Sequence, residues 1–226
     1  MRIAADFARR AVGLPAQAQW HASPETGVIR RMLDRVGGEI ARATSVVRYA
    51  PGSRFAAHTH GGGEELLVLD GVFGDEHGLY PAGSYLRNPI GTAHAPYSEP
   101  GCTLLVKLWQ FDPADRQPLM LDTTVAGWSA GPAAGIETLP LHRFGAERVA
   151  LQRWRPGSRL SKMHYPGGAE FYVLDGSFED EEGSYTQDAW LRLPPGAVHR
   201  PRSPAGCRLY LKTGHLPPRR LPAPGA

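Results

Sequence analysis

Residues 51–96 read PGSRFAAHTHGGGEELLVLDGVFGDEHGLYPAGSYLRNPIGTAHAP, and residues 156–201 read PGSRLSKMHYPGGAEFYVLDGSFEDEEGSYTQDAWLRLPPGAVHRP. The two stretches align without a gap at a constant offset of 105 residues, and 27 of the 57 positions in 51–107 are identical in both copies. Chance does not produce such a match, so we interpret the chain as an internal duplication. The period is that of a domain, because solenoid repeats run about 20–50 residues.

The repeat sets the expected domain boundaries. Upstream of the main block the copies remain alignable, which places the start of the first copy near Trp20 and that of the second near Trp128. The expected segments are an N-terminal extension (1–19), a first domain (20–112), a connector (113–127), a second domain (128–215) and a Pro-rich tail (216–226). The stretch 1–14 is predicted to form a short helix.

Short apolar runs alternate with Gly- and Pro-rich turn signals. TSVVRYA (44–50), ELLVLDGVF (65–73) and CTLLVKLWQF (102–111) each have about the length and composition of a strand. No part of 40–112 shows a sustained helical period. The pattern is typical of many short antiparallel strands, so the predicted fold class is all-β, with a sandwich or barrel in each copy.

The composition excludes several classes of protein. The formal net charge is only +3 and no dense basic tract occurs, which argues against a nucleic-acid partner. No apolar run is long enough to span a membrane, and the N-terminus lacks the apolar core of a secretory signal. Two cysteines cannot make a disulfide framework. We therefore expect a cytoplasmic protein with neither nucleic-acid nor membrane partners.

Metal-ligand residue types gather in the first copy. His58 and His60 are separated by one residue, so on a strand both imidazoles face the same side. Three glycines, 61–63, permit a tight turn that brings Glu64 back beside them, and His94 comes from a second hairpin. Three imidazoles and a carboxylate suit zinc, iron, manganese, nickel or copper and leave one or two coordination positions open. We predict one divalent metal ion here, with a small-molecule ligand at the metal.

The spacing of these residues carries a family resemblance. The motifs are Gly52-x5-His58-x-His60-x3-Glu64-x6-Gly71 and Gly83-x5-Pro89-x-Gly91-x2-His94. They resemble the two motifs of the cupin superfamily, except that Ser98 stands where an Asn is usual. The resemblance implies two tandem cupin barrels (double-stranded β-helix, or jelly-roll, barrels) with the metal inside the first. The amino-acid sequence of residues 58–89 looks most like the cupin domain of ChrR-type anti-sigma factors. Those proteins also carry a sigma-binding zinc domain with a Cys-x2-Cys motif, and we expect that module to be missing.

The second copy keeps few of the ligand residues. At the same offset the ligand positions hold Met163, Tyr165, Ala169 and His199. We expect this copy to lack a metal and to stabilise the first copy or form an interface. The alternative is that a β-bulge gathers His164, Glu170 and His199 into a second site.

Several other repeated residues are interpreted as structural. Glu65 is expected to be a rim or surface carboxylate, and Asp75 a hairpin-turn residue in the sequence DEHG. Arg87 recurs as Arg192, which favours an ion pair needed by the fold. Cys102 and Cys207 are expected to be buried fillers.

Two functions of different classes remain open. The first is a non-catalytic, metal-binding sensor or regulatory module of the ChrR cupin type, with zinc as the favoured metal. The second is a metal-dependent dioxygenase that uses iron, manganese or nickel and acts on a small dicarbonyl or phenolic substrate. No catalytic residue is assigned. A homodimer is plausible for barrels of this kind.

Overall fold

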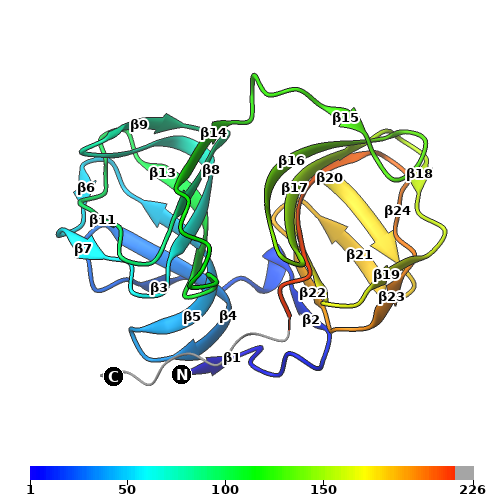
Figure 1. The fold of residues 1–226 in the computed structure, drawn as a ribbon, viewed down its shortest axis with the longest axis horizontal. Helices are drawn as coiled ribbons and strands as arrows, with labels where there is room; N and C mark the ends of the chain where they lie inside the picture. The colour runs from blue at the N-terminus through cyan, green and yellow to red at the C-terminus, as the bar shows by residue number, and fades with distance from the viewer. Residues whose placement is uncertain (217–226) are drawn as a thin grey trace. The chain divides into compact units, whose positions relative to one another are not determined.

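The computed structural model describes residues 1–216 and is built almost entirely of β-strands (Figure 1). No α-helix occurs among these residues, and one turn of 3-10 helix spans Pro15–Gln17. None of the described helical segments could cross a membrane. The predicted all-β class is confirmed. The expected Pro-rich tail lies outside the described residues except for Leu216.

The chain divides into two compact units. Unit 1 contains Met1–Ala5 and Gln19–Val125, and unit 2 contains Asp6–Ala18 and residues 126–216. The segment before the first repeat thus contributes to both units. The linking segment after the first repeat belongs to unit 1 as far as Val125.

Unit 1 is built on a long antiparallel sheet and a separate strand pair, β7 with β11. The main path runs in the order β1-β4-β5-β13-β8-β10-β14. The strands are β1 (Arg2–Ile3), β3 (His21–Ala22), β4 (Val28–Gly37), β5 (Ala41–Tyr49), β6 (Ser53–Arg54), β7 (His58–Thr59), β8 (Glu64–Asp75), β9 (Gly78–Pro81), β10 (Ser84–Asn88), β11 (Ala93–His94), β12 (Tyr97–Ser98), β13 (Cys102–Leu108) and β14 (Leu119–Asp122).

Unit 2 repeats this arrangement, with the path β15-β16-β17-β25-β20-β22-β2 and the pair β19 with β23. Its strands are β2 (Ala11–Gly13), β15 (Ser129–Ala130), β16 (Ile136–Phe144), β17 (Glu147–Trp154), β18 (Ser158–Arg159), β19 (Met163–Tyr165), β20 (Ala169–Asp180), β21 (Gly183–Thr186), β22 (Trp190–Leu193), β23 (Ala197–His199), β24 (Arg202–Ser203) and β25 (Cys207–Thr213).

One edge of each sheet is closed by a strand from outside the repeat. In unit 1 β14 pairs with β10, whereas in unit 2 the matching edge, β22, pairs with β2 near the N-terminus. The prediction of a helix over 1–14 is therefore wrong. Pairing to a sheet edge overrides the local preference of this short segment, because each strand gains backbone hydrogen bonds that an isolated short helix cannot match.

Side chains alternate between the inner and outer faces of each sheet. In unit 1 Leu66, Val68 and Leu104 face inward and belong to its apolar core. Glu64 lies on the inner face with them, and Glu65 lies on the outer face. The alternation sends two adjacent carboxylates to different environments.

Candidate metal centre

His58 and His94 face each other across a short antiparallel pair. They are directly opposed in the register of β7 and β11. His60 follows β7 and is fixed by its backbone, since its N–H donates to Thr92 O at 2.8 Å and its carbonyl accepts from the Gly91 N–H at 3.0 Å. The Pro89–Thr92 turn thus holds His60 beside the other two histidines.

The three imidazoles converge. Their ring centroids lie 5.1 Å apart for His58–His60, 5.1 Å for His58–His94 and 4.7 Å for His60–His94. One potential ligand atom from each histidine lies within 4.8 Å of those of the other two. His60 and His94 are buried and His58 is exposed. The cluster is therefore open to solvent on one side.

Glu64 completes the predicted set from the first position of β8. Its Oε2 lies 3.5 Å from His60 Nε2 and 3.6 Å from His94 Nε2. Asn88 donates to the same oxygen at 3.0 Å and orients the carboxylate. The tight three-histidine group does not include Glu64, and a ligand role for this residue stays a prediction. Glu65 is buried, not a rim carboxylate, and its Oε2 accepts from Arg87 at 2.7 Å.

The hydrogen bonding of the ring nitrogens is that of metal-ligating histidines. His58 Nδ1 lies 3.0 Å from Ala56 O, and His94 Nδ1 lies 3.1 Å from Asp75 Oδ2. An oxygen acceptor at Nδ1 favours the tautomer in which Nε2 carries the lone pair that binds metal. Nε2 of His60 and of His94 are buried and have no hydrogen-bond partner among the described residues. Buried polar atoms rarely stay unsatisfied, so this donor set fits a metal ion.

Burial lowers the pKa of His60 below its ordinary value. Glu64 opposes the shift, and the neighbouring His94 and His58 add to it. The neutral imidazole is the form that binds metal. The site therefore favours the ligand-competent state of this histidine near neutral pH.

Asp75 has a role that the sequence interpretation missed. It lies in the predicted hairpin, and its Oδ1 accepts from the His77 N–H at 2.8 Å as a turn residue does. It is also buried, with Oδ2 against His94 and the Tyr80 hydroxyl donating to Oδ1 at 3.1 Å. A carboxylate behind a ligand histidine fixes its orientation and raises its basicity.

The glycine turn before Glu64 lies directly against Trp109. A Cβ atom on Gly62 would come within 2.3 Å of the Trp109 ring, and one on Gly61 within 3.0 Å. Gly63 has a φ of +75°, which favours glycine. The three glycines are needed for close approach as well as for the turn.

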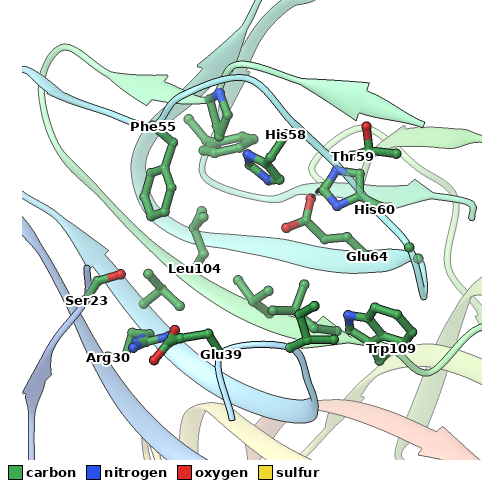
Figure 2. A pocket seen from close by; sticks show the side chains of 18 of the residues that line it. Ser23, Arg30, Glu39, Phe55, His58, Thr59, His60, Glu64, Leu104 and Trp109 are labelled. Carbon is green, nitrogen blue, oxygen red and sulfur yellow. Dashed lines mark hydrogen bonds and ion pairs between the residues drawn. The ribbon is translucent and has the colours of Figure 1, made fainter. Parts of the chain in front are cut away.

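A pocket of about 440 Å³ in unit 1 reaches the histidines, and Figure 2 shows the side chains that line it. His58, His60 and Glu64 line one end. Most of the remaining lining is apolar and includes Val47, Tyr49, Phe55, Phe73, Leu104 and Trp109. Apolar walls with a few convergent polar groups are typical of sites for small organic ligands.

Unit 2 keeps the strand register but not the ligands. Met163 opposes His199 in the pairing of β19 with β23, just as His58 opposes His94. His164 is exposed, and Glu170 bonds the Trp190 indole N–H at 2.7 Å. His199 bonds Asp180 at 2.8 Å. The alternative second site is therefore not assembled, and the described residues show no metal-ligand cluster in this unit.

Comparison with known proteins agrees with this geometry. The family model described as the ChrR Cupin-like domain matches the chain twice, over residues 8–112 and 116–217. The chain belongs to the ChrR cupin-like family. Its cupin matches together cover most of the sequence. No curated protein is significantly similar to it in sequence.

Solved structures with the cupin fold superpose over most of the chain. A provisionally assigned dioxygenase from Nostoc punctiforme gives a TM-score of 0.73 at 15% identity, covering 96% of this chain and 83% of that one. A provisionally assigned glyoxylate-induced protein from Pseudomonas aeruginosa gives 0.74 at 13%, covering 95% and 92%. An oxalate decarboxylase variant from Bacillus subtilis gives 0.60 at 13%, covering 90% and 77%. At such identities the similarity concerns the fold alone.

Proposed function

We propose that unit 1 holds one divalent metal ion through His58, His60, His94 and Glu64. The supporting observation is the pair of buried, unpartnered Nε2 atoms of His60 and His94, which converge on the Glu64 carboxylate. Zinc is the first candidate, and iron, manganese and nickel are alternatives for the same donor set. When bound, the ion would supply Lewis acidity at the end of the apolar pocket.

We further propose that this site serves a cytoplasmic sensor or regulatory module of the ChrR cupin type. The pocket gives a small organic molecule access to the histidines, and His58 is solvent-exposed. Unit 2 has the same strand order without the ligand set, which suits a supporting role. Ligand occupancy at the metal would then be the signal.

A dioxygenase is the second candidate, and the apolar lining of the pocket favours it. Such walls would exclude water from a small dicarbonyl or phenolic substrate. The hydrogen bond from Asn88 would hold the Glu64 carboxylate in place beside it. The Nostoc protein with a similar fold is provisionally assigned as a dioxygenase, which adds to this candidate. Oxygen uptake by metal-loaded protein separates the two functions.

Elemental analysis of untagged protein by plasma mass spectrometry tests the metal site. We expect about one metal atom per chain in the wild type and a large loss in His60→Ala, because that change removes a buried ligand. His164→Ala is the matched control, since His164 is an exposed histidine of the equivalent strand. Unchanged metal content in His60→Ala would refute the site. Two atoms per chain would show that unit 2 also binds metal.

Metal identity and turnover then test the role. Zinc with no oxygen consumption on diketone or phenolic substrates supports the regulatory module. Iron, manganese or nickel with substrate-dependent oxygen uptake supports the enzyme, and Glu64→Gln should then reduce turnover together with metal affinity.

A further inference from the structure

Arg30 is a charged residue on the inner, mostly apolar face of unit 1. In the sheet it pairs with Val47 of β5, and Val47 pairs in turn with Leu104 of β13. Directly paired residues of antiparallel strands project to the same face. Arg30, Val47 and Leu104 accordingly all line the pocket that reaches the histidines. Charged side chains seldom occupy such a position without a partner or a function.

Its guanidinium is only partly engaged. Nη1 donates to Glu39 Oε2 over a long 3.4 Å, and the Glu39 side chain is 70% exposed whereas that of Arg30 is 19% exposed. Nε of Arg30 is buried and has no hydrogen-bond partner among the described residues. A guanidinium has five N–H donors in a fork that matches a carboxylate. Arg30 therefore has unused donors in the pocket, and the exposed Glu39 can move away.

The arginine is not part of the repeated framework. The offset of 108 residues that carries Trp20 to Trp128 carries Arg30 to Thr138. The pocket of unit 2 at the matching place, which Met163 and Tyr165 line, has no lysine or arginine among the residues of 1–216 that line it. Among these described lining residues, a cation thus occurs in the pocket beside the histidine cluster and not in the matching pocket of unit 2.

Arg30 and the histidines lie at separate ends of the pocket. Figure 2 shows Arg30 with Glu39 at one end and His58, His60 and Glu64 at the other, with Leu104 and further apolar side chains between them. A molecule that binds at the histidines, along the apolar side chains and at Arg30 needs a metal-binding head, an apolar middle and an anionic tail.

We infer that the pocket takes a small organic acid of this kind, whose tail carboxylate is bound by Arg30 and whose head carries oxygen donors for the metal. The inference rests on the proposed metal site. It defines the ligand class further, since it adds a carboxylate at a fixed place remote from the metal. The Arg30 guanidinium binds the tail by charge-assisted hydrogen bonds, and the apolar walls bury the chain between the two ends.

Two matched probes test the assignment, the dicarboxylate 2-oxosuberate and the monocarboxylate 2-oxooctanoate. Both have the same chain length and the same 2-oxo-acid head, and only the first has a tail carboxylate. Calorimetry on zinc-loaded protein measures their dissociation constants. We expect the dicarboxylate to bind roughly tenfold to hundredfold more tightly, as hydrogen bonds to a charged group allow.

Variants assign the discrimination to Arg30. Arg30→Gln should reduce the affinity for 2-oxosuberate to that for 2-oxooctanoate and leave the metal content unchanged. Glu39→Gln should strengthen binding of 2-oxosuberate several-fold, because it removes the competing carboxylate. Arg153→Gln is the control, since Arg153 pairs with Glu137 in unit 2 and does not line this pocket, so the change should not affect binding of either acid.

Three results would overturn the inference. They are equal binding of the two acids by the wild type, discrimination that survives in Arg30→Gln, and no binding of either acid by metal-loaded protein. Each of them leaves the metal site standing, because metal content is measured separately. Failure of the metal site itself would appear as unchanged metal in His60→Ala.

Discussion

His94 and His199 occupy equivalent positions but present opposite ring nitrogens to equivalent aspartates. In unit 1 Nδ1 of His94 lies 3.1 Å from Asp75 Oδ2, whereas in unit 2 Nε2 of His199 lies 2.8 Å from Asp180 Oδ2. His94 therefore directs Nε2 toward the ligand cluster. His199 directs Nδ1 to a buried position where it has no described hydrogen-bond partner. The same histidine–carboxylate pair thus belongs to the proposed metal site in one unit and to packing in the other.

Replacing Asp75 should weaken metal binding without removing a ligand. Asp75→Asn removes the carboxylate that orients the His94 ring, so we expect metal affinity to fall about tenfold to hundredfold. Competition with a chelator measures the dissociation constant. Asp180→Asn is the matched control in unit 2 and should leave that constant unchanged. Equal metal affinity in Asp75→Asn and the wild type would show that Asp75 does not position His94.

A methyl group at Gly62 should displace Trp109. Gly62→Ala places a Cβ atom 2.3 Å from the ring, and such overpacking costs about 1–3 kcal/mol of unfolding free energy. Urea unfolding measures the loss. Gly38→Ala is the control because a Cβ there meets nothing within 4 Å. Equal stabilities of the two variants would contradict the close packing of the glycine turn on Trp109.

Both cysteine thiols should be unreactive in the folded protein. Burial raises the pKa of Cys102 to about 11 and that of Cys207 to about 11. The thiolate is the reactive form, so labelling by a disulfide reagent near pH 8 should be slow until urea unfolds the chain. As pH rises, the thiols ionise in the unfolded chain before they ionise in the folded one. The contribution of the protonated thiols to folding stability is therefore complete below their ordinary pKa of 9.0 and is lost as pH rises toward 11. Fast labelling of native protein would contradict it.

Removing Arg10 should destabilise unit 2 in a pH-dependent way. Burial would raise the pKa of Asp180, but hydrogen bonds from His199, Arg10 and the Glu182 amide hold it well below its ordinary 3.8. Arg10 lies 2.7 Å from Asp180, and we expect Arg10→Gln to cost about 1–3 kcal/mol near neutral pH.

The lowered pKa of Asp180 determines how the destabilisation by Arg10→Gln changes with pH. Its contribution is present above the ordinary value and is lost as falling pH protonates the carboxylate in the folded state. The difference between Arg10→Gln and the wild type in urea unfolding should therefore shrink in acid. Arg200→Gln removes an exposed pair with Glu181 and should have little effect at any pH. A pH-independent cost for Arg10→Gln would contradict the Asp180 pairing.

The sequence predicted the histidine cluster because its signal is local. His58 and His60 are two residues apart, so a strand places both on the same face. A turn of three glycines then returns the chain to Glu64, and short-range geometry brings most of the site together. His94 needed the motif spacing of the second hairpin. The cysteines were also predicted correctly as buried residues.

Asp75 and Arg30 were missed for different physical reasons. Asp75 begins a polar turn sequence, and composition does not reveal that one member of the turn faces the core. Its recurrence 19 residues before the histidine in both copies, as Asp75–His94 and Asp180–His199, was the available signal. Arg30 occurs in one copy only, and its inward direction depends on the register with Val47.

Residues 6–18, near the N-terminus, complete the sheet of unit 2, and this affects how the protein can be made. Arg10 and Asp180 are 170 residues apart in the chain, so a nascent polypeptide exposes the β2 sequence long before its partner strand is synthesised. Unit 2 cannot complete its sheet edge until almost the whole chain has left the ribosome, and pairing at such separation slows folding. A gene fragment cut at the boundary of the sequence repeat would encode the second cupin without its edge strand β2. Expression of either half alone should therefore be planned on the spatial units, with residues 6–18 joined to the second.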